Sequence, residues 1–374
     1  MFLFKKKQKN YLGIDISASA IKLVELEKKD ERYSLKNYAV FSLKEYFKKK
    51  DKKDNLKLAN LPNEEVAEII KRAINSAKIE SRNAYLSVPV YSSFSTLVDF
   101  PIMSEKEIAS SIAFEARKYI PVPISEVVLD WSVVSSQKSN SDKESKHKLL
   151  DSSGSKIPKQ VSKQEILLIA VPKEIINNYN KIINLAGLEL KAIEEETFSL
   201  SRSLMGNDKT LTLLVDAGFR SINVSIIDNG YIKLTHNLEM GGIKINEAIA
   251  KHMNLSLEEA EEIKIKLSNN ELTDAHSARL REIINSVLKI IIIEIRKIIN
   301  TYQVKYNKKI EKCILTGGGF ELVGFIDYFN SELSLDTSLG DPFARIIYPS
   351  SLKPAIKELG PSLSVAVGLA MREE

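Results

Sequence analysis

The sequence predicts a duplicated α/β fold of two lobes. Strand-like segments alternate with amphipathic helical segments along the 374 residues, as is typical of α/β proteins. Sliding the first half over the second places Leu12–Ile16 on Leu213–Ala217, and Ile21–Leu23 on Ile222–Val224. Both copies contain a strand ending near an aspartate, a turn of small polar residues and a second strand. A ligand site is therefore expected between the copies.

Composition excludes several classes of protein. Hydrophobic residues make up 44% and charged residues 28% of the chain, as in soluble globular proteins. The single cysteine, Cys313, excludes an intrachain disulfide framework and a cysteine-based zinc cluster. The four histidines lack the spacing of a histidine metal site. The net charge of +5 is too small to indicate nucleic-acid binding, and we expect no nucleic-acid partner.

The N-terminal tip argues against secretion. Met1–Asn10 (MFLFKKKQKN) places a short apolar run before its lysines, the reverse of a signal peptide, so a cytoplasmic protein is expected. Two interpretations of this tip stay open, weak contact with an anionic membrane face and a frayed terminus. The most apolar stretch, Val287–Ile299, contains four charged residues and predicts a buried amphipathic helix rather than a membrane span.

The first lobe is predicted to open with three strands. Tyr11–Ile16 and Ile21–Leu26 are apolar, and Tyr33–Val40 alternates between apolar and polar residues. The lysine- and aspartate-rich run Phe47–Asn55 predicts a solvated loop, and Pro62–Ser76 has the acidic first turn and periodicity of a helix.

The middle of the chain alternates between strands and helices. Ser104 and Glu107 form a capping-box pattern that predicts a helix running to about Tyr119. Gly187 is a typical helix C-cap and predicts that the helix Lys173–Ala186 ends there. Ser135–Lys163 is rich in Ser, Lys and Asp and predicts a mobile loop. The predicted strands are Ala84–Pro89, Thr96–Phe100, Val127–Val134, Glu165–Val171 and Leu188–Ile193.

The second half begins near Leu211 and has the same character. An Asp-Asn-Gly sequence at Asp228–Gly230 predicts a hairpin turn. The predicted strands are Leu211–Asp216, Ile222–Ile227, Tyr231–Leu238 and Lys312–Thr316. The predicted helices are Gly241–Met253, Leu257–Lys266, Arg279–Tyr302, Leu322–Leu333 and Pro361–Met371.

The two small turns indicate phosphate and metal binding. Backbone N–H groups in such turns approach phosphate oxygens closely, and Ser17, Ser19 and Ser221 add hydroxyl donors. Lys22 is placed to reach phosphate charge. Asp15 and Asp216 are candidates to hold Mg²⁺ through its waters, because Mg²⁺ keeps several waters and uses one or two carboxylates. The alternative is that each aspartate only caps a hairpin turn.

A third element follows a strand. Gly317-Gly318-Gly319 allows a planar base to lie against bare backbone beside Phe320. Glu261 and Lys264 lie one helical turn apart, which suits a ribose and a base edge. The alternative for this pair is a solvated charged face.

At these residues the sequence resembles the actin-like ATPase superfamily and, within it, the PilM family of type IV pilus assembly proteins, relatives of FtsA. The stretches that carry the resemblance are 13–26 (GIDISASAIKLVEL), 100–131, 167–190, 213–227 (LLVDAGFRSINVSII) and 314–325 (ILTGGGFELVGF). The middle block, 100–131, is the most specific of them.

The resemblance implies an actin-like (ribonuclease-H-like) two-lobe fold with a small inserted α+β subdomain. It implies a first lobe over 1–200 and a second lobe over 201–374, with the helix 361–371 returning toward the first lobe. The inserted FtsA/PilM-type (SHS2) subdomain is expected over about 92–190. The resemblance also implies ATP or ADP with Mg²⁺ in the cleft between the lobes.

The cofactor-binding residues expected from the motifs and the resemblance come from both halves. They are Asp15, Ser17, Ser19, Lys22, Asp216, Gly218, Arg220, Ser221, Gly241, Gly242, Glu261, Lys264, Gly317, Gly318, Gly319 and Phe320. The family usually has glycine where this chain has Ser17, and a Cβ there is expected to crowd phosphate. Phe219 and Arg220 stand where small hydroxyl residues are commoner, and Arg220 is expected either to pair with phosphate or to fill the cleft.

The resemblance implies a cytoplasmic scaffold that binds the N-terminal tail of a PilN-like inner-membrane protein beside the inserted subdomain. Membrane association would be indirect, through the other proteins of the pilus platform, and self-association is a further possibility. One alternative is an active ATPase or small-molecule kinase, with Glu196 as a weak catalytic candidate for orienting water. Another is an FtsA-like filament former, disfavoured because no amphipathic anchor is expected after Met371.

Overall fold

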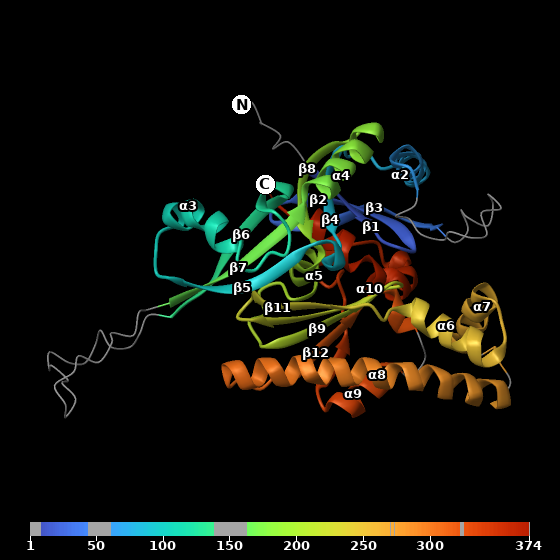
Figure 1. Ribbon diagram of the computed structural model, residues 1–374. Helices are drawn as coiled ribbons and strands as arrows, with labels where there is room; N and C mark the ends of the chain where they lie inside the picture. Colours follow the sequence, from blue (N-terminus) through green and yellow to red (C-terminus); the bar gives the residue numbers. More distant parts are fainter. Residues whose placement is uncertain are drawn as a thin grey trace, which may run out of the picture. The chain divides into compact units, whose positions relative to one another are not determined.

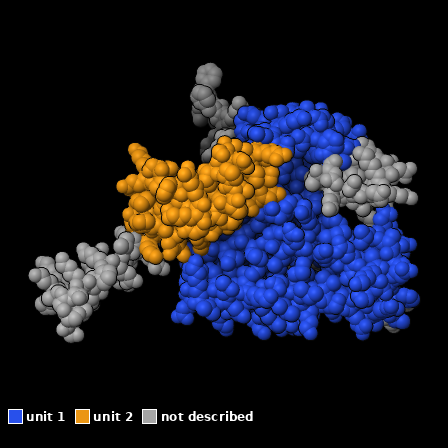
Figure 2. Space-filling model, in the orientation of Figure 1, with its two compact units in different colours: residues 1–91, 176–374 blue, residues 92–175 orange. Residues whose placement is uncertain are grey.

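The computed structural model describes residues 9–43, 61–137, 163–269, 271–272, 274–321 and 325–373. The chain divides into two compact units (Figure 2), unit 1 with Met1–Tyr91 and Ile176–Glu374, and unit 2 with Ser92–Ile175. Unit 2 is therefore an insertion in the sequence of unit 1. The N-terminal tip, the loop expected at Phe47–Asn55 and most of the loop expected at Ser135–Lys163 lie outside the described residues.

The first sheet of unit 1 is mixed. Its strands are β1 (Lys9–Ile16), β2 (Ala20–Lys29), β3 (Arg32–Ser42), β4 (Asn83–Val88), β8 (Glu189–Glu195) and β14 (Ile346–Ile347). They lie in the order β14-β3-β2-β1-β4-β8. β1, β2 and β3 form an antiparallel meander, and β4 and β8 continue the sheet in parallel pairings. All but β14 are predicted by the sequence, and two residues are too few to show a periodicity.

Alternate residues of β1 face opposite sides of this sheet. Leu12 and Ile14 pack in a core with α2 (Asn63–Ala77) and the end of α4 (Lys173–Leu185). Gly13 faces the other side, where a Cβ would lie 2.0 Å from the Ala366 carbonyl oxygen of α10 (Lys353–Ala370). The absence of a side chain at Gly13 thus lets α10 cross β1 in direct backbone contact.

The second sheet of unit 1 contains a turn equivalent to the β1–β2 turn of the first sheet. Its strands are β9 (Thr212–Ala217), β10 (Ile222–Asp228), β11 (Tyr231–Leu238), β12 (Lys312–Thr316) and β13 (Asp336–Leu339), in the order β11-β10-β9-β12-β13. Asn223 lies opposite Asp216 in this sheet, as Lys22 lies opposite Asp15 in the first. The predicted hairpin turn is present, with Asn229 and Gly230 both at positive φ.

Four helices accompany the second sheet (Figure 1): α6 (Gly242–Met253), α7 (Leu257–Ser268), α8 (Asp274–Tyr306) and α9 (Phe325–Leu333). Ile249 of α6, Leu288 of α8 and Phe329 of α9 share one buried core with Leu213 of β9. The predicted start of α9 at Leu322 lies outside the described residues.

Two helices lie between the sheets, α5 (Glu196–Leu204) and α10. Val24 of the first sheet and Leu214 of the second share a core with Leu200 of α5 and Leu363 of α10. The sequence does not predict α5, because Ser and Thr residues obscure its pattern. Ser199 Oγ donates to the Glu196 carbonyl oxygen (2.8 Å), so this serine is satisfied inside the helix.

The predicted start of the last helix at Pro361 is wrong, because α10 begins at Lys353 and Pro361 lies inside it. A proline inside a helix removes its own N–H from the helical hydrogen bonds. The Pro361 carbonyl oxygen accepts bonds from the backbone N–H of Gly317 (3.1 Å) and the hydroxyl of Thr316 (2.9 Å). These two bonds join the helix to the end of β12.

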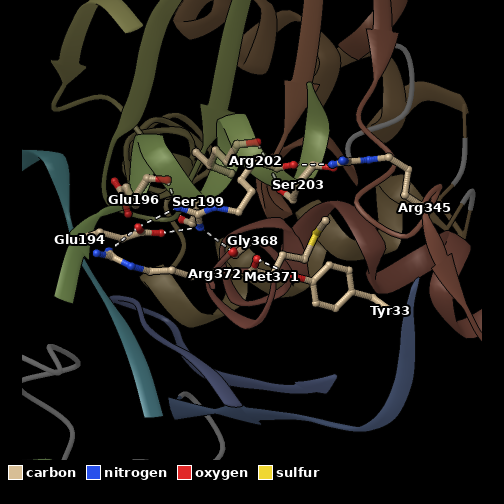
Figure 3. A network of polar contacts seen from close by, with 11 residues as sticks. Tyr33, Glu194, Glu196, Ser199, Arg202, Ser203, Arg345, Gly368, Met371 and Arg372 are labelled. Atoms are coloured by element: carbon tan, nitrogen blue, oxygen red, sulfur yellow. Dashed lines mark hydrogen bonds and ion pairs between the residues drawn. The ribbon is translucent and has the colours of Figure 1, made fainter. Parts of the chain in front are cut away.

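A network of charged groups fixes the end of α10 (Figure 3). The Glu194 carboxylate accepts two bonds from Arg202 of α5 (2.7 and 2.9 Å) and one from Arg372 (2.6 Å). Arg202 also donates to the Gly368 carbonyl oxygen, and Tyr33 donates to that of Met371. All three glutamates at residues 194–196 are largely buried.

The described residues of unit 2 form an antiparallel sheet of three strands and the helix α3 (Glu105–Ala116). Its strands β5 (Phe94–Pro101), β6 (Val127–Gln137) and β7 (Lys163–Pro172) lie in the order β5-β7-β6. Ile108 and Ile112 of α3 (Glu105–Ala116) pack on this sheet. The predicted capping box is confirmed, with the Ser104 N–H donating to the Glu107 carboxylate (2.7 Å).

Two predicted boundaries in unit 2 differ from the structure. The helix α3 ends at Ala116 rather than at about Tyr119. Residues 135–137, expected in a loop, continue β6, because they pair in register with residues 163–165 of β7.

Candidate functional site

A cleft of about 700 Å³ in unit 1 brings the two turns and the glycine run together. The residues expected at the site that line it are Asp15, Ser17, Ser19, Lys22, Glu196, Asp216, Gly218, Arg220, Ser221, Gly241, Gly242, Glu261, Lys264, Gly317, Gly318 and Gly319. The side chain of Phe320 lies outside the described part of the chain. Residues from both copies of the repeat therefore surround one cavity.

The first turn joins β1 to β2. The backbone N–H and the hydroxyl of Ser17 both donate to the Ala20 carbonyl oxygen, at 3.0 and 2.8 Å. Ser17 does not have a positive φ, so its backbone conformation does not favour glycine at this position. The serine hydroxyl closes the turn instead.

Lys22 is held by a carboxylate. Its Nζ lies 3.2 Å from Asp15 Oδ2, and both side chains are largely buried. In this conformation the charge of Lys22 is shared with Asp15, and its approach to phosphate stays a prediction.

The second turn, residues 217–221, is bonded to the start of α6. The carbonyl oxygens of Gly218, Phe219 and Arg220 accept bonds from the N–H groups of Gly242 (3.0 Å), Ile243 (2.8 Å) and Gly241 (3.1 Å), respectively. These bonds satisfy N–H groups that a helix N-terminus otherwise leaves unpaired. A Cβ at Gly241 would lie 2.5 Å from the Arg220 carbonyl carbon, so this contact requires glycine.

Three of the acidic side chains that line the cleft, Asp15, Glu196 and Asp216, influence one another's ionisation. The pKa of Asp216 is raised to about 6, mainly by burial; the charge of Lys22 lowers it, the charge of Asp15 raises it, and a hydrogen bond from Asn223 lowers it. Burial raises the pKa of Glu196 well above its usual value, and the charges of Asp216 and Asp15 add to this. A cation placed among these acids would relieve their mutual repulsion.

Glu196 is anchored by two hydrogen bonds. Its Oε1 accepts from the Val90 backbone N–H (3.1 Å) and from the Asn223 amide. The Asn223 amide oxygen in turn accepts from Asn237 (2.6 Å). Glu196 thus joins α5 to β10 and to the segment after β4.

The glycine run packs tightly on the second turn. Gly317 has a φ of +93°, and a Cβ there would lie 2.4 Å from both Asp216 Oδ1 and the Ala217 carbonyl oxygen. A Cβ at Gly319 would lie 2.9 Å from Ala217 Cβ. Gly318 has open space beside it, with the nearest atom at 3.9 Å, so this glycine offers bare backbone to a ligand.

The pair on α7 is tied to α6. Lys264 Nζ donates to Glu261 Oε2 (2.7 Å) and to the Asn246 amide oxygen (2.8 Å), and the Asn246 amide donates to Glu261. The alternative of a solvated charged face is therefore wrong, since both charged side chains are mostly buried and bonded.

Tyr91, Asn223 and Asn246 take part in this site but are not among the residues that the sequence predicts. Asn223 was accessible from the repeat, because it takes the place of Lys22 when the two copies are aligned. Tyr91, in the 3-10 helix η2 (Val90–Ser92), lies 4.5 Å from the Arg220 guanidinium, measured to the ring centroid. No periodicity or motif marks Tyr91 or Asn246.

Solved structures define the class of fold. The chain resembles the PilM-PilN type IV pilus biogenesis complex, with a TM-score of 0.78 and 22% identity over 97% of this chain and 98% of that one. It also resembles the ethanolamine utilization protein EutJ from Carboxydothermus hydrogenoformans (TM-score 0.51, 15% identity, 97% and 89% coverage). MreB 5 of Spiroplasma citri bound to AMPPNP matches with a TM-score of 0.51 and 12% identity over 96% and 94%. These likenesses confirm the predicted actin-like fold.

The family follows from the sequence match. Residues 13–153 and 149–374 match the family model described as type IV pilus assembly protein PilM, so the chain belongs to this family. The cell division protein FtsA of Bacillus subtilis (strain 168) is 28% identical over 118 residues, which are 31% of this chain and 27% of FtsA. The chain thus matches only about a quarter of the length of this curated relative. The predicted resemblance to both proteins is confirmed.

The described part of the chain gives two further findings. None of its helices is both long enough and apolar enough to cross a membrane. Within the same residues, no group of three or more His, Cys, Asp or Glu side chains is arranged to hold a metal ion directly. Any metal in the cleft would therefore depend on fewer protein ligands, with water or a ligand completing its coordination.

Proposed function

We propose that this chain is a nucleotide-binding scaffold of the type IV pilus assembly platform, with ATP or ADP in the cleft of unit 1. The observation that carries the proposal is the convergence of both aspartate turns and the glycine run on one cavity. Membership of the PilM family supports the role in pilus assembly. The AMPPNP bound by an MreB protein of similar fold supports the choice of ligand.

Mg²⁺ fits the donor set of this cleft. Asp15 and Asp216 both line it, and each raises the cost of ionising the acids around it. Mg²⁺ prefers one or two carboxylates with several waters and substrate phosphates. Asp15 and Asp216 would hold the ion through its waters, and the ion would supply positive charge opposite the phosphates.

We expect turnover to be weak or absent. A general base must be ionised near neutral pH, whereas burial and the charges of Asp216 and Asp15 raise the pKa of Glu196 and so disfavour its ionised form. Its hydrogen bonds to Val90 and Asn223 indicate an anchoring role for this side chain. Glu196 is thus poorly suited to act as the base of an ATPase or kinase.

Calorimetric titration of the full chain with ATP tests the nucleotide site. We expect Asp216→Asn, and separately removal of Mg²⁺ with EDTA, to weaken binding at least tenfold, about 1.4 kcal/mol. Asp99→Asn is the matched control, because Asp99 is an exposed aspartate of unit 2. Wild-type affinity in Asp216→Asn would remove Asp216 from the site.

The partner proposed for the scaffold is the N-terminal tail of a PilN-like membrane protein, bound beside unit 2. Support comes from the fold shared with the PilM-PilN complex. Unit 2 also exposes large apolar side chains that could receive the apolar anchors of a short tail. They are Ile102, Phe114, Tyr119, Val122 and Val128.

A fluorescence titration with the labelled tail peptide tests this partner. Replacing residues 92–190 as a block is unsuitable, because Ile182 and Ile183 belong to the core of unit 1. We instead expect Phe114→Ser to weaken peptide binding in the full chain, with little dependence on salt. Val304→Ser, at an exposed apolar position of α8, is the control. Equal binding by wild type and by Ser variants at all five positions would place the tail elsewhere.

A further inference from the structure

Arg220 and Tyr91 form a pair inside the cleft. The Arg220 guanidinium carbon lies 4.5 Å from the centroid of the Tyr91 ring, within the range of a cation–π interaction. Both residues line the cavity that holds the aspartate turns. Arg220 belongs to the second turn, and Tyr91 belongs to η2. The pair therefore bridges two segments of unit 1 across the cleft wall.

Two lysines that line the cleft are already held by carboxylates. Lys22 is paired with Asp15, and Lys264 is paired with Glu261. Among the described residues, the interactions recorded for the Arg220 side chain are with Tyr91 and involve no carboxylate ion pair. Arg220 can therefore turn toward an anion without leaving a buried carboxylate unpaired.

A phosphate would be the stronger partner for this side chain. A guanidinium forms two parallel, charge-assisted hydrogen bonds to phosphate oxygens. Arg220 and Tyr91 are both exposed, and a cation–π contact at an exposed site stabilises a guanidinium much less than those two hydrogen bonds do. Arg220 lies in the second turn, which is predicted to bind phosphate, so the Tyr91 ring and a phosphate would compete for its guanidinium.

We propose that Arg220 is the residue with which the cleft selects phosphate-bearing ligands, and that Tyr91 competes with phosphate for its guanidinium. This inference rests on the proposed nucleotide site. Without ligand, Arg220 lies on the Tyr91 ring. With a nucleotide bound, Arg220 contacts the phosphates and the ring is released. The affinity for phosphate-bearing ligands is thus lowered by the strength of the Arg220–Tyr91 contact.

Tyr91 lies where the chain passes from unit 1 into unit 2, so exchange of the ring for phosphate at Arg220 would affect this junction. Tyr91 is the last residue of unit 1 before unit 2 begins at Ser92. The backbone N–H of its neighbour Val90 donates to the Glu196 carboxylate, and this hydrogen bond does not involve Arg220. Release of Tyr91 would therefore change the contacts of the last residue before unit 2 and leave Val90 in place.

Calorimetric titrations with ATP and with adenosine test the proposal. We expect Arg220→Ala to weaken ATP at least tenfold and to leave adenosine unchanged. Tyr91→Leu should tighten ATP roughly two- to fivefold, the equivalent of one exposed cation–π contact. Tyr91→Phe keeps the ring but loses the hydroxyl that hydrogen-bonds with Arg220, and should lie between wild type and Tyr91→Leu. In the double variant, Tyr91→Leu should not change the ATP affinity further, because without Arg220 there is no guanidinium for Tyr91 and phosphate to compete for.

The failures can be told apart. If wild type binds no ATP, the proposed nucleotide site falls, and this inference falls with it. If wild type binds ATP but Tyr91→Leu binds it equally or more weakly, the competition alone is refuted. If Arg220→Ala weakens adenosine as much as ATP, Arg220 does not select phosphate. Thermal unfolding of each variant confirms that the chains compared are folded.

Discussion

Single residues shape the cleft mainly through positions where no side chain fits. Gly317 combines a left-handed backbone with contact against Asp216 and Ala217, so its lack of a Cβ sets how closely the glycine run approaches the second turn. Gly187 has a similar φ of +74° but no atom within 4 Å of an added Cβ. Gly187 therefore needs glycine only for its positive φ, whereas Gly317 needs it for its positive φ and for lack of space for a Cβ.

This comparison gives a prediction. Gly187→Ala carries only the cost of a positive φ and should lower the free energy of unfolding by about 1 kcal/mol. Gly317→Ala adds a steric clash and should lower it by about 2–4 kcal/mol, and it should also weaken ATP binding. Urea denaturation and calorimetry of both variants measure these effects. Equal losses of stability would show that the contact with Asp216 relaxes freely.

Residues of the site differ in how far the sequence could predict them. Asp15 and Asp216 were found because the repeat places them at equivalent positions, and the same alignment contains Asn223. Tyr91 reaches the cleft only through the path of the chain after β4. Its role depends on a tertiary contact with Arg220, which no local pattern encodes.

At the scale of elements, α10 connects the cleft to the end of the chain. The carbonyl of Pro361 is bonded to Thr316 and Gly317, and Gly13 allows the helix to lie on β1. The Glu194 network then holds the last turn of the helix to α5 (Figure 3). This helix is therefore fixed at the glycine run, at its crossing of β1 and at its end.

The Glu194 network should contribute measurably to stability. Its carboxylate is 8% exposed and accepts bonds from two arginines, so Glu194→Gln leaves both cations underpaired. We expect a loss of about 2 kcal/mol in the free energy of unfolding by urea. Glu189→Gln, on the same strand but 67% exposed, should cost less than about 1 kcal/mol. Similar values for the two variants would contradict a structural role for the network.

Most elements were predictable because their apolar periodicity is undisturbed. The exceptions are instructive. The helix α5 is short and rich in Ser and Thr, whose hydroxyl bonds to helix carbonyls cannot be seen in the sequence. The start of α10 was misplaced because proline is typical of a first helical turn, whereas Pro361 lies inside the helix.

At the scale of the whole molecule, duplication is the feature from which most of the account follows. The sequence repeat predicted two sheets with equivalent turns, and the pairings of Asp15 with Lys22 and of Asp216 with Asn223 show the correspondence in three dimensions. The insertion was suggested only by the family resemblance, since nothing in the local pattern separates unit 2 from its neighbours.

The central claim is that both aspartate turns and the glycine run form one nucleotide site, and hydrogen exchange of the full chain tests it most directly. Mg·ATP should slow exchange of the amides in residues 16–20, 217–221 and 317–319 together. Excess adenosine should protect the glycine run more than either turn, because it lacks phosphates. Saturating Mg·ATP that leaves either aspartate turn unprotected would contradict the claim.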